Sequence, residues 1–165
     1  MARPQLTPGF GKTAAAAALA ALVSAATAAA AIAPTPGRYR GKTSQHRFAS
    51  MRVAKGGHVH TVKLRWLAKC DEPGYVWGVD QTTWSDEVGG GIEQEGDHFS
   101  DGGTYTEEGA HGNSGRITAN IKGHFTSASR AQGRFFIKVD ARKNGKHVDW
   151  CRAKGRWHVS RKGGG

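Results

Sequence analysis

The sequence has only two cysteines, no second long apolar run after residues 14–33 and no helical periodicity after that run. Each of these absences excludes a class of protein. Two cysteines in 165 residues cannot supply a structural zinc site built from thiolates alone. After residues 14–33 no other apolar stretch approaches the length of a membrane span. The lack of a heptad or 3.6-residue pattern excludes a coiled coil or a helical bundle. The chain after residue 33 consists instead of short segments of alternating polarity.

The N-terminal segment has the features of an export signal. Arg3 and Lys12 precede the Ala-rich run, and Ala26-Thr27-Ala28 is a small-x-small cleavage site. We therefore expect a signal peptide over residues 1–28 that is removed on export, and a secreted or extracellular protein. A retained membrane anchor is the alternative, because the run is about long enough to span a bilayer.

The sequence after the signal predicts one domain with short flanks. We expect a linker over residues 29–37, a β-domain over residues 38–160 and a disordered basic tail over residues 161–165. A chain of roughly 130 residues has the size of a single domain.

The clearest strand pattern lies in residues 60–70, where apolar residues such as Leu64 and Trp66 alternate with mostly basic ones. A period of two is typical of a half-buried β-strand. The segment ends at Cys70, and in an exported chain the second cysteine, Cys151, is its expected disulfide partner. The bond would close a loop of about 80 residues and contribute on the order of 4 kcal/mol. Two free thiols are the alternative.

Asn144-Gly145 is the strongest turn signal in the chain and predicts a two-residue type I′ hairpin. A regular ladder on either side would place Val139 opposite Trp150 and Ala141 opposite Val148. The same register puts Cys151 on the opposite face from Trp150, so we expect a bulge or bend near Cys151.

Similar alternating segments recur along the chain and predict eight to ten strands joined by short turns. The expected fold is therefore all-β, an antiparallel meander that forms either a sandwich or a closed barrel. Residues 101–115 are rich in glycine, and we expect a mobile loop there with Thr104-Tyr105-Thr106 as a short edge strand.

Several spaced motifs in this order resemble those of small exported bacterial β-domains of uncharacterised function. The resemblance covers nearly all of the mature domain and implies a secreted β-domain closed by a disulfide, with no catalytic residues to carry over. The overall shape is also similar to lipocalin and avidin-like barrels, which says little about function. The motifs are Gly37-x-Tyr39-x-Gly41-x-Thr43, Asp97-His98-Phe99, Gly123-x-Phe125, Gly133-x-Phe135 and Cys151-x-x-x-Gly155-x-Trp157.

Charge is strongly segregated along a chain whose formal net charge is +11. Residues 34–69 contain nine Lys or Arg and no acid, residues 71–115 contain eleven Asp or Glu and no Lys or Arg, and residues 116–165 are basic again. A basic surface attracts nucleic acid, acidic polysaccharide or anionic lipid. The alternative is that the charges serve solubility and that the acidic segment pairs internally with the basic strands.

Aromatic residues provide the first candidate binding site. Exposed rings near carboxylates and amides can stack on sugar faces, and we expect Tyr75, Trp77 and Trp84 to form such a surface. The remaining tryptophans suited to the core are Trp66, Trp150 and Trp157, because large aromatic side chains dominate core burial.

Acidic residues and histidines provide candidate metal ligands. Hard oxygen ligands on a Gly-rich loop suit calcium, and four such residues lie close in sequence, although their spacing is not that of an EF-hand: Glu93, Glu95, Asp97 and Asp101. His58-x-His60 places two imidazoles on one strand face, which could hold zinc or copper. Surface carboxylates and surface histidines without a metal are the simpler interpretation, and no cofactor is expected.

No catalytic residues are predicted. Gly112-Asn113-Ser114-Gly115 lacks the G-x-S-x-G pattern of a nucleophile elbow. The leading hypothesis is a non-catalytic, monomeric binding module at the cell envelope or outside the cell, docked on an anionic polysaccharide or envelope glycan, with no nucleic-acid partner. Two alternatives are a barrel that binds a small apolar ligand and a small hydrolase that uses carboxylates of residues 71–115.

Overall fold

The computed structural model describes residues 32–73, 76–86 and 91–161, and this part of the chain is an all-β domain with one 3₁₀ turn, η1, at Ala110–Gly112. The predicted signal peptide and Tyr75 lie outside the described residues. The strands are β1 Gly37–Thr43, β2 Phe48–Val53, β3 Val59–Cys70, β4 Val76–Ser85, β5 Glu93–Glu95, β6 His98–Glu108, β7 Asn113–Ser127, β8 Arg130–Lys143 and β9 Lys146–Arg161.

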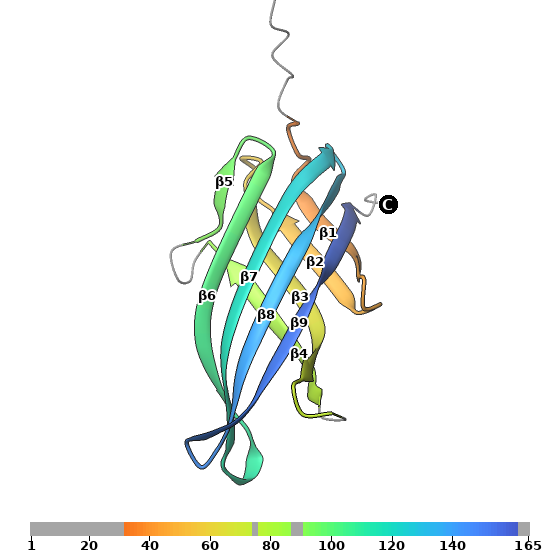
Figure 1. Cartoon of the computed structure of the whole chain (residues 1–165). Coiled ribbons are helices and arrows are strands. Elements are labelled where there is room, and N and C mark those ends of the chain that lie inside the picture. The colour runs from red at the N-terminus through yellow and green to blue at the C-terminus, as the bar shows by residue number, and fades with distance from the viewer. Residues whose placement is uncertain (1–31, 74–75, 87–90, 162–165) are drawn as a thin grey trace, which may run out of the picture.

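The strands form one antiparallel sheet in the order β4-β3-β2-β1-β9-β8-β7-β6-β5. Apart from β4 and β5, which stand at the two edges, neighbours in sequence are neighbours in the sheet, as expected for consecutive hairpins, and the first strand pairs with the last. The sheet curls strongly, so that β6 to β9 form one wall and β1 to β4 cross behind it (Figure 1). In the described residues no helix is long and apolar enough to cross a membrane.

Residues that alternate inward along the strands fill the space between the two walls. The predicted inward set of β3 is buried, including Leu64 and Trp66, and so are Ile117 and Ile121 of β7. Trp157 of β9 is also fully buried, which confirms its predicted place in the core. The alternation of apolar and polar residues is therefore sufficient to assign the inner face of these strands.

Two glycines make room for the largest core side chains. A Cβ on Gly123 would lie 2.6 Å from the Trp157 ring and 2.5 Å from the Phe99 ring. A Cβ on Gly133 would overlap the main-chain carbonyl oxygen of Lys122 on the neighbouring strand. Glycine is required here because the backbone and aromatic rings approach too closely for any side chain.

The predicted disulfide is present. Cys70 is bonded to Cys151 across a sequence separation of 81 residues, where the end of β3 pairs directly with β9. Elsewhere in the sheet β1 and β2 lie between β3 and β9, but here the two strands are direct neighbours. The bond therefore joins the two walls of the curled sheet. A disulfide is compatible with an extracellular protein.

The β8–β9 hairpin confirms the predicted turn but not the predicted register. Asn144 and Gly145 have positive φ angles of 50° and 77°, as a type I′ turn requires. An irregularity after Ala141 shifts the ladder by one residue, so Val139 pairs with Cys151 and Asp140 pairs with Trp150. The predicted pairings of Val139 and Ala141 were therefore wrong, because the bulge lies beside the turn rather than near Cys151.

The shift also removes Trp150 from the core, contrary to prediction. Its ring is half-buried and points away from the inner face. On that outer side, the Lys138 ammonium lies 3.9 Å from the centroid of the Trp150 ring. The interaction is a cation–π contact that a lysine on the neighbouring strand supplies.

The predicted mobile loop at residues 101–115 is mostly regular structure. Strand β6 continues to Glu108 and pairs residue by residue with β7, including Gly102 with Asn120. Strand β7 has a regular apolar alternation and pairs with β6 along its length. This pairing outweighs the weak strand propensity of the β6 glycines. At the C-terminus, Arg161 belongs to β9, and its Nε donates to the Pro36 carbonyl at 3.0 Å, so the predicted tail does not begin there.

Part of the predicted linker is attached to the β-domain by hydrogen bonds. The backbone N–H of Thr35 donates to the Ala128 carbonyl at 2.7 Å. The Tyr39 hydroxyl donates to the Thr35 carbonyl at 2.7 Å and lies 2.8 Å from the Ala128 carbonyl.

Candidate functional site

A groove of about 290 Å³ lies on the outer face of β1, β2 and β3. We call it the basic groove. Its outward-facing lining combines four cations, two hydroxyls and one aromatic ring: Arg38, Arg40, Arg52, Lys63, Ser50, Thr61 and Phe48.

The strand register explains why these cations gather. Arg38 pairs with Arg52 across β1 and β2, and Ser50 lies between Arg40 and Lys63. Like charges opposite one another destabilise a sheet. None of the four cations takes part in an ion pair with another described residue. Within the described residues, no ion pair therefore balances the positive charge of the groove.

Phe48 gives the groove an apolar edge. Its ring is 44% exposed and its residue pairs with Lys42 across the β1–β2 ladder. An exposed ring beside several cations can cover the apolar face of a sugar or another ring, while the cations hold attached acidic groups.

The same outer face continues onto the second wall because β1 pairs with β9. Lys122, Arg134 and Arg156 lie directly opposite one another on β7, β8 and β9. Phe136, 42% exposed, lies near this row beside a shallow groove of about 430 Å³. Pairing of the first and last strands thus joins the two basic segments of the sequence into one cationic outer face.

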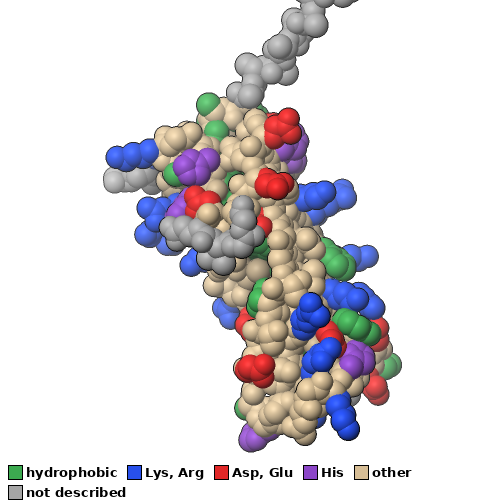
Figure 2. Space-filling model, turned by 90° about the vertical axis from the view of Figure 1, so that its left-hand side faces the viewer, with side chains coloured by type: hydrophobic (Ala, Val, Ile, Leu, Met, Phe, Trp, Pro, Cys, Tyr) green, Lys and Arg blue, Asp and Glu red, His purple; other side chains and the backbone are tan. Residues whose placement is uncertain are grey.

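The acidic segment forms a different part of the surface, over β4, β5 and β6. Figure 2 looks at this side, where acidic and histidine side chains lie near the upper end and a largely uncharged band runs along the middle. Within the described residues, Asp71 with Arg152 is the only ion pair between the acidic segment and a Lys or Arg. Internal neutralisation of the acidic segment is therefore not the arrangement that the structure shows.

The predicted aromatic binding surface is not formed by the described residues. Trp84 is only 4% exposed and its Nε1 donates to the Ala119 carbonyl at 3.4 Å, so the expectation of an exposed ring was wrong. Register with β3 places Trp84 opposite Val62, which faces inward. Trp77 is half-buried and packs against Gly115 of β7. The exposed aromatic residues are instead Phe48 and Phe136.

The four candidate calcium ligands do not come together as a ligand set. Glu93 and Glu95 are exposed on β5, and the Asp97 carboxylate lies 2.8 Å from Nδ1 of His98. Asp101 lies on β6, and burial raises its pKa while a backbone hydrogen bond from Gly102 lowers it and Glu93 raises it. In the described part of the chain the only group with metal-ligand spacing contains the two disulfide-bonded cysteines.

The two histidines of the His58-x-His60 pair converge on Asp86 at the end of β4. Nδ1 of His60 lies 2.6 Å from one carboxylate oxygen, and Nε2 of His58 lies 3.5 Å from the other. A hydrogen bond from His60 is the main cause that lowers the pKa of Asp86. The imidazoles are therefore engaged by a carboxylate that the sequence pattern did not indicate.

A second carboxyl site lies where β4 faces β6, and sequence reasoning missed it because the two residues are 27 positions apart. The Glu107 carboxyl lies beside that of Asp80, and hydrogen bonding to Asp80, burial and the Asp80 charge raise the pKa of Glu107 to about 7. Beside them, Trp66 Nε1 donates to Thr82 Oγ1 at 3.0 Å, and Thr82 Oγ1 lies 2.8 Å from the Tyr105 hydroxyl.

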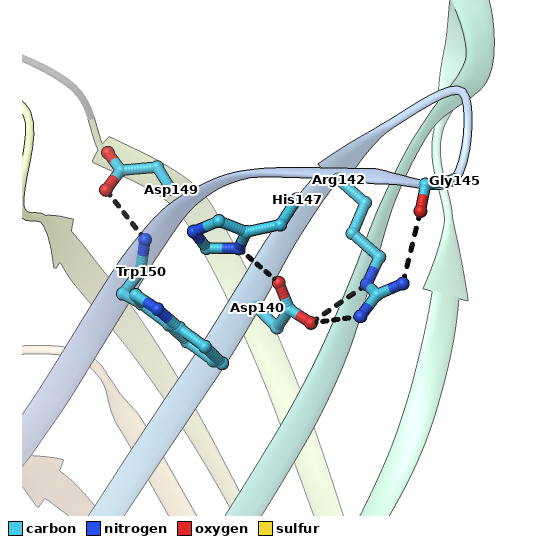
Figure 3. Close-up of polar contacts among 6 residues, drawn as sticks. All are labelled: Asp140, Arg142, Gly145, His147, Asp149 and Trp150. Carbon is cyan, nitrogen blue, oxygen red and sulfur yellow. Dashed lines mark hydrogen bonds and ion pairs between the residues drawn. The ribbon is translucent and has the colours of Figure 1, made fainter.

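A third polar cluster supports the β8–β9 hairpin (Figure 3). The buried Asp140 carboxylate accepts hydrogen bonds from Arg142 Nε at 2.8 Å and Nη2 at 2.6 Å, and lies 2.6 Å from His147 Nδ1. Arg142 Nη1 also donates to the Gly145 carbonyl in the turn at 3.1 Å. These contacts of Asp140, Arg142 and His147 Nδ1 all lie within the hairpin, which indicates a structural role.

No family model matches the chain, and no curated protein has a similar sequence.

Proposed function

We propose that this chain is a secreted, non-catalytic binding module whose basic groove binds an acidic polysaccharide of the cell envelope or its surroundings. The signal peptide of residues 1–28 would direct its export. The observation that carries the proposal is the set of four cations in the groove that have no acidic partner among the described residues.

A polysaccharide suits the groove better than a flat anionic membrane does. The groove is concave and combines cations with the hydroxyls of Ser50 and Thr61 and with the exposed Phe48 ring. Acidic groups on the sugar would meet the cations, sugar hydroxyls would meet Ser50 and Thr61, and an apolar sugar face would meet Phe48.

We further infer that the fold is an incompletely closed barrel rather than a sandwich. All nine strands belong to one sheet, and β3 pairs with β9 in addition to its neighbours β2 and β4, so the sheet curls back on itself. The alternative of an apolar ligand inside this barrel finds little support, because Trp66, Trp157 and Phe125 are fully buried in the interior.

The hydrolase alternative is less well supported than the binding module. Two carboxylates of a glycoside hydrolase stand about 5 Å or more apart so that a sugar or water fits between them. Asp80 and Glu107 are instead close enough for hydrogen bonding to Asp80 to be the main cause that raises the pKa of Glu107, which implies a shorter separation than that.

The test compares two double variants of the whole secreted domain by titration with dextran sulfate and polygalacturonate, with neutral dextran as the ligand control. The groove variant is Arg40→Gln with Lys63→Gln, and the matched variant is Lys143→Gln with Lys146→Gln at the exposed β8–β9 turn. Both remove two exposed positive charges.

The groove variant is expected to raise the Kd at least about tenfold, since two charge-assisted contacts each contribute roughly 1 kcal/mol or more. The turn variant is expected to change the Kd by about twofold or less through net charge alone. Equal losses in both variants, or binding of neutral dextran, would contradict the proposed site.

A further inference from the structure

The edges of the curled sheet face each other along β4 and β6. In the sheet, β4 pairs only with β3, and β5 covers β6 only at residues 98–100. Residues 101–108 of β6 and the outer side of β4 therefore pair with no further strand in the described part of the chain. We call the space between these two edges the β4–β6 seam.

Side chains bridge this seam in an antiparallel register. Thr82 of β4 contacts Tyr105 of β6 with 2.8 Å between the hydroxyl oxygens. Two residues earlier on β4 lies Asp80, and two residues later on β6 lies Glu107, whose pKa Asp80 influences directly. In an antiparallel pair, a step backward along one strand matches a step forward along the other, as seen here.

A third contact continues the same register. Two residues forward on β4, Trp84 reaches the carbonyl of Ala119, which is the β7 partner of Gly103. The two edges are therefore aligned as barrel neighbours, joined by side chains instead of a main-chain ladder. A cleft of about 160 Å³ lies between them, lined on one side by residues 82–85 and on the other by residues 101–105.

The carboxyl pair at one end of the seam requires a proton. Asp80 Oδ2 is buried and has no hydrogen-bond partner among the described residues, whereas Asp80 Oδ1 accepts from the backbone N–H of Gln81. A protonated Glu107 supplies a donor, whereas two ionised carboxylates in contact repel each other. The titratable groups that act on this pair are Glu107, Asp80 and Tyr105, and Tyr105 carries no charge until alkaline pH because burial raises its pKa.

We propose that the β4–β6 seam is a proton-dependent closure, in which a proton shared by Asp80 and Glu107 holds the two sheet edges together and its loss lets them separate. Separation exposes the cleft and the unpaired main chain of both edges to solvent. The inward hydroxyl bridge between Thr82 and Tyr105 is the contact that would weaken next. This closure is distinct from the basic groove, which lies on the outer face of β1 to β3.

The test measures the width of the seam directly. Spin labels on Thr83→Cys and Thr106→Cys, both at exposed positions of the facing strands, report the distance between β4 and β6 by electron paramagnetic resonance. Carbon-13 NMR of the labelled Glu carboxyl groups reports the protonation of Glu107 in the same pH series.

Between pH 6 and pH 8 the protonated fraction of a group with a pKa near 7 falls from about nine-tenths to about one-tenth. The fraction of separated spin pairs is expected to rise over this range with the same midpoint as the Glu107 carboxyl. The Glu107→Gln variant keeps a permanent donor and is expected to stay narrow up to pH 8.5. The control Glu108→Gln, at the exposed neighbouring position, is expected to widen like the parent protein.

The proposal is wrong if Glu107 titrates below about pH 5, where ordinary carboxyls titrate. It is equally wrong if the Glu107 carboxyl titrates near pH 7 while the spin distance stays constant, or if Glu107→Gln widens as much as Glu108→Gln. Circular dichroism at each pH shows that the whole domain stays folded during the measurement.

Discussion

Replacement of Asp140 by Asn tests how the β8–β9 hairpin is stabilised. Asp140 is only 6% exposed, and its carboxylate is held by two nitrogens of Arg142 and by His147. Asn has nearly the same shape but carries no charge and has one acceptor oxygen fewer. The substitution therefore removes charge-assisted hydrogen bonds without leaving a large cavity.

The expected loss in the free energy of unfolding is about 2–3 kcal/mol. Breaking a fully buried ion pair costs about 3–5 kcal/mol because a charge is left without a partner. Here the partner side chains remain 39% exposed for Arg142 and 44% exposed for His147, so water can hydrate them and the cost is smaller. For a domain of this size the loss corresponds to a fall in Tm of roughly 8–12 °C.

The pH dependence distinguishes charge from packing. Burial is the largest single influence and raises the pKa of Asp140, but hydrogen bonds from His147 and Arg142 together hold that pKa below its ordinary value. A carboxyl with a depressed pKa stabilises the fold above its unfolded pKa, and this contribution is lost as pH falls through the folded pKa. The difference between parent and variant should therefore be full above about pH 5 and shrink in more acidic solution.

The measurement is urea unfolding at a series of pH values, with Asp149→Asn as the control. Asp149 is less buried, and among the described residues its carboxylate accepts from two backbone N–H groups alone, those of Trp150 at 2.6 Å and Glu72 at 3.2 Å. The control is expected to lose less than about 1 kcal/mol. An Asp140→Asn loss no larger than the control, or one that does not change with pH, would refute the role assigned to this cluster.

Two further substitutions test the fold. Replacing Cys70 and Cys151 by Ala should lower the unfolding free energy by on the order of 4 kcal/mol, because the bond closes a loop of 81 residues, and a loss under about 1 kcal/mol would contradict this. Gly133→Ala should cost several kcal/mol, roughly 2–4, because its Cβ would overlap the Lys122 carbonyl, whereas Gly103→Ala, whose Cβ meets nothing within 4 Å, should be nearly neutral; equal thermal midpoints for the two variants would refute the packing argument.

Alternation of polarity was enough to predict the central strands and their inner faces. In β3 and β7 nearly every second residue is apolar, so only one register buries them. The disulfide was predictable for a different reason, since the chain has only two cysteines and the first follows its longest patterned segment.

The errors arose where a local irregularity changes which face a residue occupies. One bulge beside the Asn144-Gly145 turn moves Trp150 from the inner face to the outer one. A shift in the β3–β4 ladder after Trp66 similarly allows Trp77 and Trp84 both to pack toward the core, although an odd number of positions separates them. A period-two pattern cannot locate a single inserted residue, because the alternation is correct on both sides of it.

The functional groupings depend on strand neighbours that no local pattern reveals. The basic groove requires the register of three strands, and the Asp80–Glu107 pair requires the sheet to curl until its edges meet. The sequence did show that positive and negative charges are separated along the chain. It could not show that β1 pairs with β9 and so joins the two basic segments.

The most direct test of the proposed function is to map backbone amide shifts while a short sulfated oligosaccharide is added to the folded domain. The account predicts saturable shifts concentrated at outward positions of β1, β2 and β3, above all around Arg40, Phe48 and Lys63, which weaken as salt is added. Shifts spread evenly over all exposed lysines and arginines, or concentrated at the β4–β6 seam, would contradict it.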